Sequence, residues 1–146
     1  MLFFSDIASL RKNFMEQNKT KQKYALVTGG SRGIGRAVCI QLAKDLSYNL
    51  LINYNGNKDA AQQTLNEVKA MGAKGEIIQF DVTNPESVNK AFDVWHENNK
   101  DAIIEVIINN AGITKDGMFM WMKPEDWHSV INTSLNGFYN VTQPLL

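Results

Sequence analysis

The chain has 146 residues, 44% of them hydrophobic, which is enough to bury a core as one domain. Its 15 basic residues balance 15 acidic ones, which argues against a protein that binds nucleic acid or a membrane surface. The single cysteine, Cys39, excludes an internal disulfide and favours a reducing compartment, so we expect a cytoplasmic protein with a small buried thiol. No apolar run approaches the ~18 residues of a membrane span, and the two histidines lack metal-ligand spacing.

Residues 1–22 differ in character from the rest of the chain. Asp6 and Glu16 argue against a transit peptide, and the apolar start is too short for the hydrophobic region of a signal peptide. Residues 18–23 are polar and basic, as in a solvated linker. We expect residues 1–22 to be an extension outside the fold and a candidate for disorder, and residues 23–146 to form one domain.

A glycine-rich segment, residues 28–35, follows directly on the apolar run 24–27. Apolar residues then recur at four-residue spacing, as on a helix face: Ile34, Val38, Leu42 and Leu46. A strand, a glycine turn and a helix form a phosphate-binding arrangement, because glycines let the backbone approach a pyrophosphate and a helix N-terminus offers unpaired N–H groups. The spacing Gly-x-x-x-Gly-x-Gly differs from the common dinucleotide fingerprint, so a tight turn without a ligand is the alternative.

The rest of the chain alternates between strand-like and helix-like segments. Further strands are expected at residues 49–54, 76–80 and 103–108, and helices at residues 59–71, from about Pro85 and from about Pro124. The nearly continuous apolar run 103–108 predicts a strand covered on both faces. The inward-facing residues expected on the last helix are Trp127, Val130, Ile131, Leu135, Phe138 and Val141. Strands that alternate with helices predict an α/β fold, a doubly wound parallel sheet with four strands in this part.

Three motifs stand in order at the carboxyl ends of predicted strands: Thr28-Gly29-x-x-x-Gly33-x-Gly35, Asp81-Val82 and Asn109-Asn110-Ala111-Gly112. Together they resemble the short-chain dehydrogenase/reductases, whose fold is Rossmann-like, from about residue 24 to residue 146. Within that family, residues 110–116 and the helix of Trp127 are most similar to the 3-oxoacyl-[acyl-carrier-protein] reductases, and the acetoacetyl-CoA reductases share the pattern. The resemblance implies reduction of a thioester carried by acyl-carrier protein or CoA, and a homo-oligomer, commonly a tetramer, when complete.

The resemblance also implies which residues contact a dinucleotide. The pyrophosphate and adenosine side would be held by Gly29, Ser31, Arg32, Gly33, Ile34 and Gly35. Asp81 and Val82 would flank the adenine, and Asn109, Ala111 and Gly112 would line the ribose. Taken singly, Asp81 could form a turn or a helix cap, and Asn109 and Asn110 a strand-end turn. Their succession at strand ends, where open α/β sheets bind ligands, favours the binding site.

The end of the second strand bears on the choice of cofactor. NAD-binding proteins of this fold place an acid there to accept from the ribose 2′-hydroxyl. Here Asn53 and Tyr54 stand at that place, and no carboxylate precedes Asp59. A 2′-phosphate would meet no repulsion, and Arg32 could pair with it. We therefore expect NADP(H), with Asn53 among the contact residues; an exposed loop cation is the alternative for Arg32.

The family's catalytic groups are a Tyr and a Lys four residues apart on the helix after the fifth strand, with an upstream Ser. The one literal match, Tyr54 to Lys58, spans Asn-Gly-Asn after the second strand and is interpreted as a chance match. Tyr139 has Gln143 four residues on. We expect residues 23–146 to be an NADP-binding domain truncated before the catalytic motif and inactive alone. A non-catalytic nucleotide-binding or interaction protein is the alternative.

One position inside the matching region departs from the family pattern. The helix after Asn-Asn-Ala-Gly usually carries an asparagine that helps hold a proton-relay water, and Ser134 stands at that position. Ser134 is therefore the candidate catalytic residue of this chain. A helical serine that bonds back to the Val130 carbonyl is the alternative. Residues 118–122, rich in methionine and aromatic side chains, fit an acyl-chain wall, a subunit contact or core packing.

Overall fold

The structure is a computed structural model that describes residues 21–45 and 48–146. Its sheet has four parallel strands in the order β3-β2-β1-β4: β1 (Gln22–Val27), β2 (Asn49–Tyr54), β3 (Gly75–Gln79) and β4 (Ala102–Ile108). The helices are α2 (Gly33–Asp45), α3 (Lys58–Ala70), α4 (Pro85–Asn98), α5 (Pro124–Ile131) and α6 (Gly137–Thr142). The expected α/β fold with a doubly wound parallel sheet is confirmed. Gln22 belongs to β1, and what we expected of residues 1–20 lies outside the described residues.

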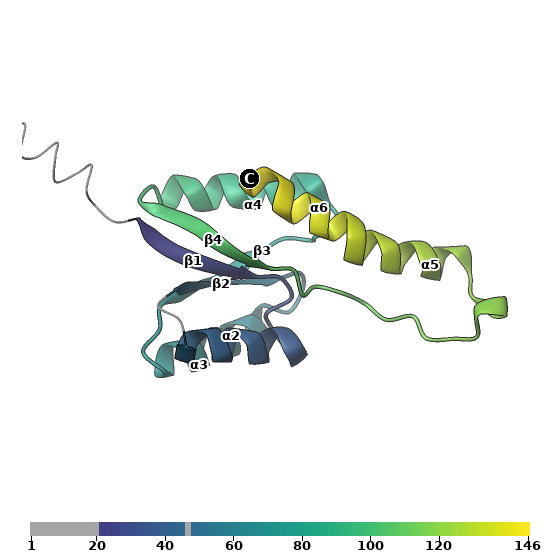
Figure 1. The fold of residues 1–146 in the computed structure, drawn as a ribbon, viewed down its shortest axis with the longest axis horizontal. Coiled ribbons are helices and arrows are strands. Elements are labelled where there is room, and N and C mark those ends of the chain that lie inside the picture. The colour runs from purple at the N-terminus through teal and green to yellow at the C-terminus, as the bar shows by residue number, and fades with distance from the viewer. Residues whose placement is uncertain (1–20, 46–47) are drawn as a thin grey trace, which may run out of the picture.

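Helices cover both faces of the sheet (Figure 1). Because side chains alternate along a strand, β1 sends Ala25 and Val27 to the face covered by α2 and α3, and Tyr24 and Leu26 to the opposite face. Cys39 lies in the first of these layers with no exposed surface, as expected of a structural thiol. The predicted buried face of α3 is confirmed by Ala61, Leu65 and Val68, which are all buried.

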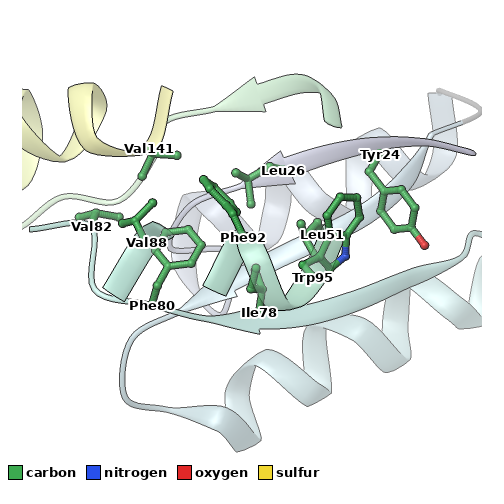
Figure 2. Packing of buried hydrophobic residues seen from close by; sticks show 10 residues of the cluster. All are labelled: Tyr24, Leu26, Leu51, Ile78, Phe80, Val82, Val88, Phe92, Trp95 and Val141. Carbon is green, nitrogen blue, oxygen red and sulfur yellow. The ribbon is translucent and has the colours of Figure 1, made fainter. Parts of the chain in front are cut away.

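The opposite face of the sheet packs against α4 and the end of α6 (Figure 2). The core there includes the predicted α4 residues Val88, Phe92 and Trp95. The expected helix start is also confirmed, because Asn84 Oδ1 caps the Ser87 amide at 3.1 Å and Pro85 occupies the first turn. A proline costs nothing there, since its missing N–H would have no helical partner.

Two expectations about buried faces were wrong at their ends. Ile34, the first residue of the predicted α2 stripe, is 77% exposed, because it stands in the first turn beyond the edge of the sheet. Leu46 lies outside the described residues. In β4 the side chains alternate between exposed and half-buried at the start of the strand, and Ile103 is 40% exposed. Within the described residues β4 pairs with β1 alone, so it is an edge strand. Its half-buried side chains still reach the core layers on both faces, Ile104 and Ile107 on one side and Val106 and Ile108 on the other.

The last helical segment departs most from the prediction. It consists of α5, a π-helical turn at Asn132–Asn136 and α6, and it extends past the sheet as an arm (Figure 1). Only Val141 of the expected inward residues is buried. Val130 and Ile131 are half-buried, whereas large fractions of the remaining side chains are exposed: Trp127, Leu135 and Phe138. The amphipathic pattern predicted a covered face, and the sheet reaches only the last turns of the segment.

Candidate functional site

The carboxyl ends of β1 and β4 lie next to each other and lead to opposite faces of the sheet. After β1 the chain enters α2 on one face, and after β4 it reaches α6, which packs beside α4 on the other. This divergence is a topological switch point, where open α/β sheets hold ligands. The structure therefore brings the glycine turn and the Asn-Asn-Ala-Gly segment to one edge of the sheet.

Hydrogen bonds clamp these two segments together. Thr28 Oγ1 lies 2.9 Å from the Asn110 amide nitrogen and 3.0 Å from that of Ala111, and accepts from both. In return the Asn110 side-chain nitrogen donates to the Thr28 carbonyl oxygen at 2.8 Å and lies 3.3 Å from that of Gly29. Sequence reasoning gave Asn110 no role of its own. The structure shows it as the brace that holds the glycine turn against the end of β4.

Different geometric constraints explain why glycine stands at each position of the turn. Gly29 and Gly33 have φ values of 63° and 55°, a left-handed backbone that disfavours other residues. A Cβ on Gly35 would lie 2.3 Å from the Gly29 carbonyl oxygen and 2.5 Å from the Asn110 side-chain nitrogen. A Cβ on Gly33, by contrast, would meet nothing within 4 Å. The turn is thus packed tightly on its inner side and open at Gly33.

The outer side of the turn presents the remaining residues predicted for the phosphate end. Arg32 and Ile34 are exposed and Ser31 is half-buried. The first turn of α2 carries no acidic residue, so the positive end of its dipole is not neutralised there. An anion could approach the backbone at this end without meeting a carboxylate of α2.

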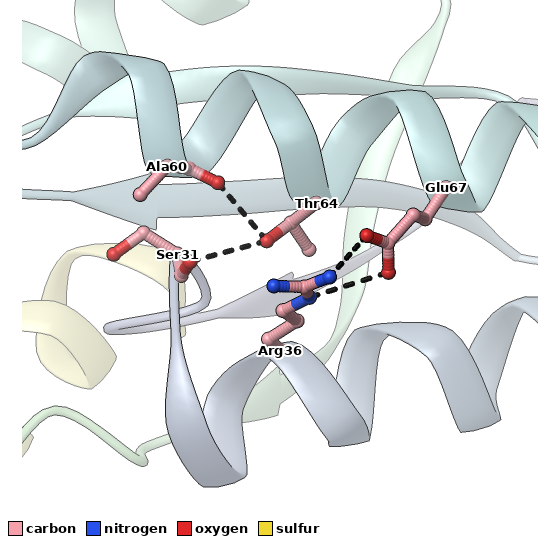
Figure 3. Close-up of polar contacts among 5 residues, drawn as sticks. All are labelled: Ser31, Arg36, Ala60, Thr64 and Glu67. Carbon is pink, nitrogen blue, oxygen red and sulfur yellow. Dashed lines mark hydrogen bonds and ion pairs between the residues drawn. The ribbon is translucent and has the colours of Figure 1, made fainter.

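Helix α3 braces the turn from behind (Figure 3). The Thr64 hydroxyl, fully buried, lies 3.2 Å from both the Ser31 and Ala60 carbonyl oxygens. Arg36 of α2 forms a two-pronged ion pair with Glu67 of α3. Sequence reasoning missed these residues. Thr64 left a signal, since it is the polar member of an otherwise apolar face, but nothing in the sequence pairs Arg36 with Glu67.

Asn53 lies at the predicted edge, but its side chain points inward. Only 2% of its surface is exposed, and its amide bonds the backbone of Gly29 and of Phe80. This inward side chain differs from what we expected of a residue that contacts the cofactor. After β2, the first carboxylate along the chain is that of the exposed Asp59, in the first turn of α3, as the sequence indicated.

Asp81 and Val82 follow β3 and lie beside the arm. Asp81 Oδ1 accepts from the Thr83 amide and hydroxyl, both at 2.8 Å, which is the turn-forming role that we weighed as the alternative. Its other oxygen, Oδ2, has no hydrogen-bond partner among residues 21–45 and 48–146 and remains available to a ligand donor. The Val82 carbonyl oxygen accepts from Asn140 at 2.9 Å, which joins this strand end to α6.

The ribose-side residues lie on the opposite side of the turn. Ala111 is half-buried by its bond to Thr28, and Gly112 is exposed. Asn109 is exposed, and its side-chain nitrogen donates to Thr142 Oγ1 at 3.1 Å. The structure therefore places the predicted residues of all three motifs around one edge of the sheet.

The candidate catalytic position differs from the rest of the site. Ser134 is exposed in the π-helical turn and makes no side-chain hydrogen bond within the part of the chain that the structure describes. The back-bond that we considered for it is made instead by Thr133, whose hydroxyl donates to the Ser129 carbonyl oxygen at 2.9 Å. Such π-helical turns occur often at functional sites. Tyr54 is 6% exposed and packs in the core, so Tyr54 and Lys58 do not form an exposed Tyr–Lys pair.

Other reactive groups give no competing site. Burial raises the pKa of the Cys39 thiol to about 12, so it is not a thiolate nucleophile at neutral pH. The described residues include no cluster of three or more His, Cys, Asp or Glu side chains that could hold a metal. Within the same ranges, none of the helices combines the length and the apolar character that a membrane crossing requires.

Comparisons with known proteins agree with this geometry. The family model described as short chain dehydrogenase matches residues 23–146. The chain is 42% identical over 121 residues to the 3-oxoacyl-[acyl-carrier-protein] reductase FabG of Staphylococcus epidermidis, an alignment that covers 83% of this chain and 48% of the relative. It is 40% identical over 123 residues to the acetoacetyl-CoA reductase of Paracoccus denitrificans, covering 84% and 48% respectively.

A solved structure has the same fold. It comes from Agrobacterium tumefaciens and is described provisionally as a gluconate dehydrogenase; it superposes with a TM-score of 0.76 at 31% identity, over 85% of this chain and 47% of the other. The chain thus spans about half the length of the relatives that it matches. The strand order, the clamped glycine turn and the family match together show that this chain belongs to the short-chain dehydrogenase/reductase family of oxidoreductases.

Proposed function

We propose that this chain is the NADP(H)-binding part of a reductase that converts a 3-oxoacyl thioester to the 3-hydroxyacyl thioester in fatty-acid synthesis. The bound nicotinamide would supply the hydride. The substrate would be carried by acyl-carrier protein or CoA, in line with what the relatives' names state. Residues 23–146 would form the cofactor domain, residues 1–22 an extension, and the complete cytoplasmic protein a homo-oligomer such as a tetramer.

The choice of NADP(H) rests on one observation: within the described residues, no carboxylate stands at the end of β2 or in the loop after it, where the 2′-phosphate would lie. Asn53 is turned inward, Asn55 is uncharged, and Arg32 is exposed beside the turn without a salt bridge within the described ranges. Arg32 would pair with the 2′-phosphate, and the open space at Gly33 would admit the pyrophosphate. Asp81 Oδ2 would accept from the adenine amine, and the Val82 backbone would bond a ring nitrogen. Asn109, Ala111 and Gly112 would line the ribose.

Binding measurements on this chain test the proposal. We expect NADPH to bind more tightly than NADH, and Arg32→Ala to weaken NADPH about ten- to a hundred-fold, since a charge-assisted contact contributes roughly 1.5–3 kcal/mol. NADH affinity should hardly change, because NADH lacks the 2′-phosphate. Lys44→Ala is the control, an exposed cation in the last turn of α2, the helix that begins directly after Arg32. Equal losses for both cofactors in Arg32→Ala would place the selectivity elsewhere.

The chain alone should bind cofactor without turning over acetoacetyl thioesters. The family's Tyr and Lys pair is not present after β4 in these 146 residues. The second candidate, a nucleotide-binding protein without the chemistry, is supported by the same clamped glycine turn, because cofactor binding does not require the catalytic pair. Sequence of the same gene beyond Leu146 discriminates between them: a Ser followed by Tyr-x-x-x-Lys supports the reductase.

Ser134 would take part in proton supply in the longer protein. Its hydroxyl is unpartnered in the described ranges and stands at the relay position of the family pattern. Ser134→Ala should lower kcat by about tenfold, part of the ~10²–10⁴-fold that proton transfer contributes, and leave NADPH affinity unchanged. Ser134→Asn should retain or raise activity. An unaltered kcat in Ser134→Ala would make this serine a structural residue.

A further inference from the structure

Asn53, the penultimate residue of β2, uses its side chain and its backbone to hold three strand ends. Its Oδ1 accepts from the Gly29 amide at 3.1 Å, and its carbonyl oxygen accepts from the Gly30 amide at 2.9 Å. Its Nδ2 lies 3.1 Å from the Phe80 carbonyl oxygen, with two further carbonyl oxygens at 3.3 and 3.4 Å. One buried residue thus connects the glycine turn after β1 with the segment that follows β3.

The chemistry of this position requires an amide. A primary amide offers an acceptor on one side and donors on the other, which matches an N–H of Gly29 facing one way and carbonyl oxygens facing the other. A carboxylate of the same shape would set a negative oxygen against the Phe80 carbonyl oxygen in a buried place. The inward position also explains how a residue at the cofactor edge can be polar and still have no contact with solvent.

We propose that Asn53 is a positioning residue that presets the cofactor cleft without touching the cofactor. It fixes the left-handed Gly29 turn at a set distance from Phe80, the residue directly before Asp81 and Val82. The two walls that would hold the pyrophosphate and the adenine are thereby ordered in advance, so binding does not bear the cost of ordering them. The identity of the ligand as a dinucleotide rests on the proposed function.

Asn53→Asp tests this with a pH profile. A protonated carboxyl keeps one acceptor and one donor, as the amide has, whereas an ionised carboxyl has acceptors alone. Burial raises the pKa of the introduced carboxyl, so the variant should bind NADPH nearly as well as wild type at acidic pH. As the pH rises through that pKa, its affinity should fall about tenfold relative to wild type at the same pH, the effect of one buried hydrogen bond turned unfavourable.

Asn99→Asp is the matched control. The Asn99 side chain also donates to a backbone carbonyl oxygen, that of Trp95 at 3.0 Å. It lies just before the start of β4, at the end of the strand away from the site. The NADPH affinity of the Asn99→Asp variant should equal that of wild type at every pH. The proposal is overturned when the affinity of Asn53→Asp runs parallel to wild type throughout, or when Asn99→Asp shows the same decline.

Amide hydrogen exchange of the ligand-free chain gives a second, independent measurement. The Gly29 and Gly30 amides should be protected in wild type and in Asn99→Asp, and selectively less protected in Asn53→Asp at high pH. Should Asn53→Asp fail to fold, the smaller change Asn53→Ser replaces it. A Gly29 amide that exchanges in wild type as fast as that of Gly56 overturns the proposal. Wild type that does not bind NADPH refutes the proposed function, and the exchange result still decides whether Asn53 positions the turn.

Discussion

The glycine turn and the α5–α6 arm are both helical or turn structures at the same edge of the sheet, and they are stabilised in opposite ways. The turn is enclosed by three neighbours: Asn110 from the segment after β4, Asn53 from β2 and Thr64 from α3. The arm is held near its end by buried Val141 and by the Asn140 bond to Val82, while Phe138 is 54% exposed. Contacts among the described residues therefore enclose the glycine turn far more completely than the arm.

This difference separates what local residues can specify from what requires more surface. The turn's partners lie in β2, in α3 and directly after β4, so contacts among the described residues hold its geometry. The arm has an apolar face without a described partner, as have Phe119 and Trp121 in the segment before it. Exposed apolar groups of this size favour contact with another protein surface, in line with the homo-oligomer that we propose.

Gly35→Ala should have the largest effect, since it strikes the most tightly packed point of the turn. The added Cβ would lie 2.3 Å from the Gly29 carbonyl oxygen. Alanine improves helix propensity by about 1 kcal/mol, but the overpacking costs about 3 kcal/mol, so the clash dominates. Unfolding by denaturant should show the loss of stability, and NADPH affinity should fall about a hundredfold.

Gly56→Ala is the control for this substitution. A Cβ there meets nothing within 4 Å, so stability and affinity should stay near wild type. A Gly35→Ala protein with unaltered NADPH affinity would show that the packing between turn and helix does not set the site.

Much of the fold could be predicted from the sequence. The glycine spacing, the capping Asn84 and the period of α3 are local signals, and the parallel sheet, the start of α4 and the buried face of α3 that the sequence predicted are confirmed. The inward turn of Asn53 could not be predicted, because its partners lie 24 and 27 residues away along the chain. The exposure of the arm could not be predicted either, since periodicity indicates that a face is apolar but not whether anything covers it.

Thr64→Val removes a hydrogen-bonding hydroxyl beside the glycine turn, and it is to be compared with the loss of a similar hydroxyl on the arm. The substitution keeps the volume but leaves the Ser31 carbonyl oxygen without its buried donor, which costs about 1 kcal/mol. We expect NADPH affinity to fall about fivefold, because Ser31 stands in the turn. Isothermal titration of the folded variant measures it.

Thr133→Val is the counterpart on the arm, where the hydroxyl bonds back to the Ser129 carbonyl oxygen at 2.9 Å. Both threonines thus lose a bond to a backbone carbonyl oxygen, but no contact of Thr133 reaches the glycine turn. Its NADPH affinity should match wild type. Equal losses in the two variants would mean that affinity follows general stability and not the order of the turn.

On the arm itself, a small change in stability is expected for Phe138→Ala. The ring is 54% exposed, so its removal gives up about half of the 1.5–3 kcal/mol that a buried side chain contributes, or about 1 kcal/mol. Val141→Ala removes far fewer atoms from a side chain with no exposed surface, and by leaving a cavity it should cost about 2 kcal/mol. The smaller deletion should therefore be the more damaging one in denaturant unfolding at low protein concentration.

Sedimentation at rising concentration should show weaker self-association for Phe138→Ala than for wild type, because the ring belongs to the uncovered face. A larger stability loss for Phe138→Ala than for Val141→Ala, independent of concentration, would mean that a segment of this same chain covers the arm, and the contrast between the two regions would then fail.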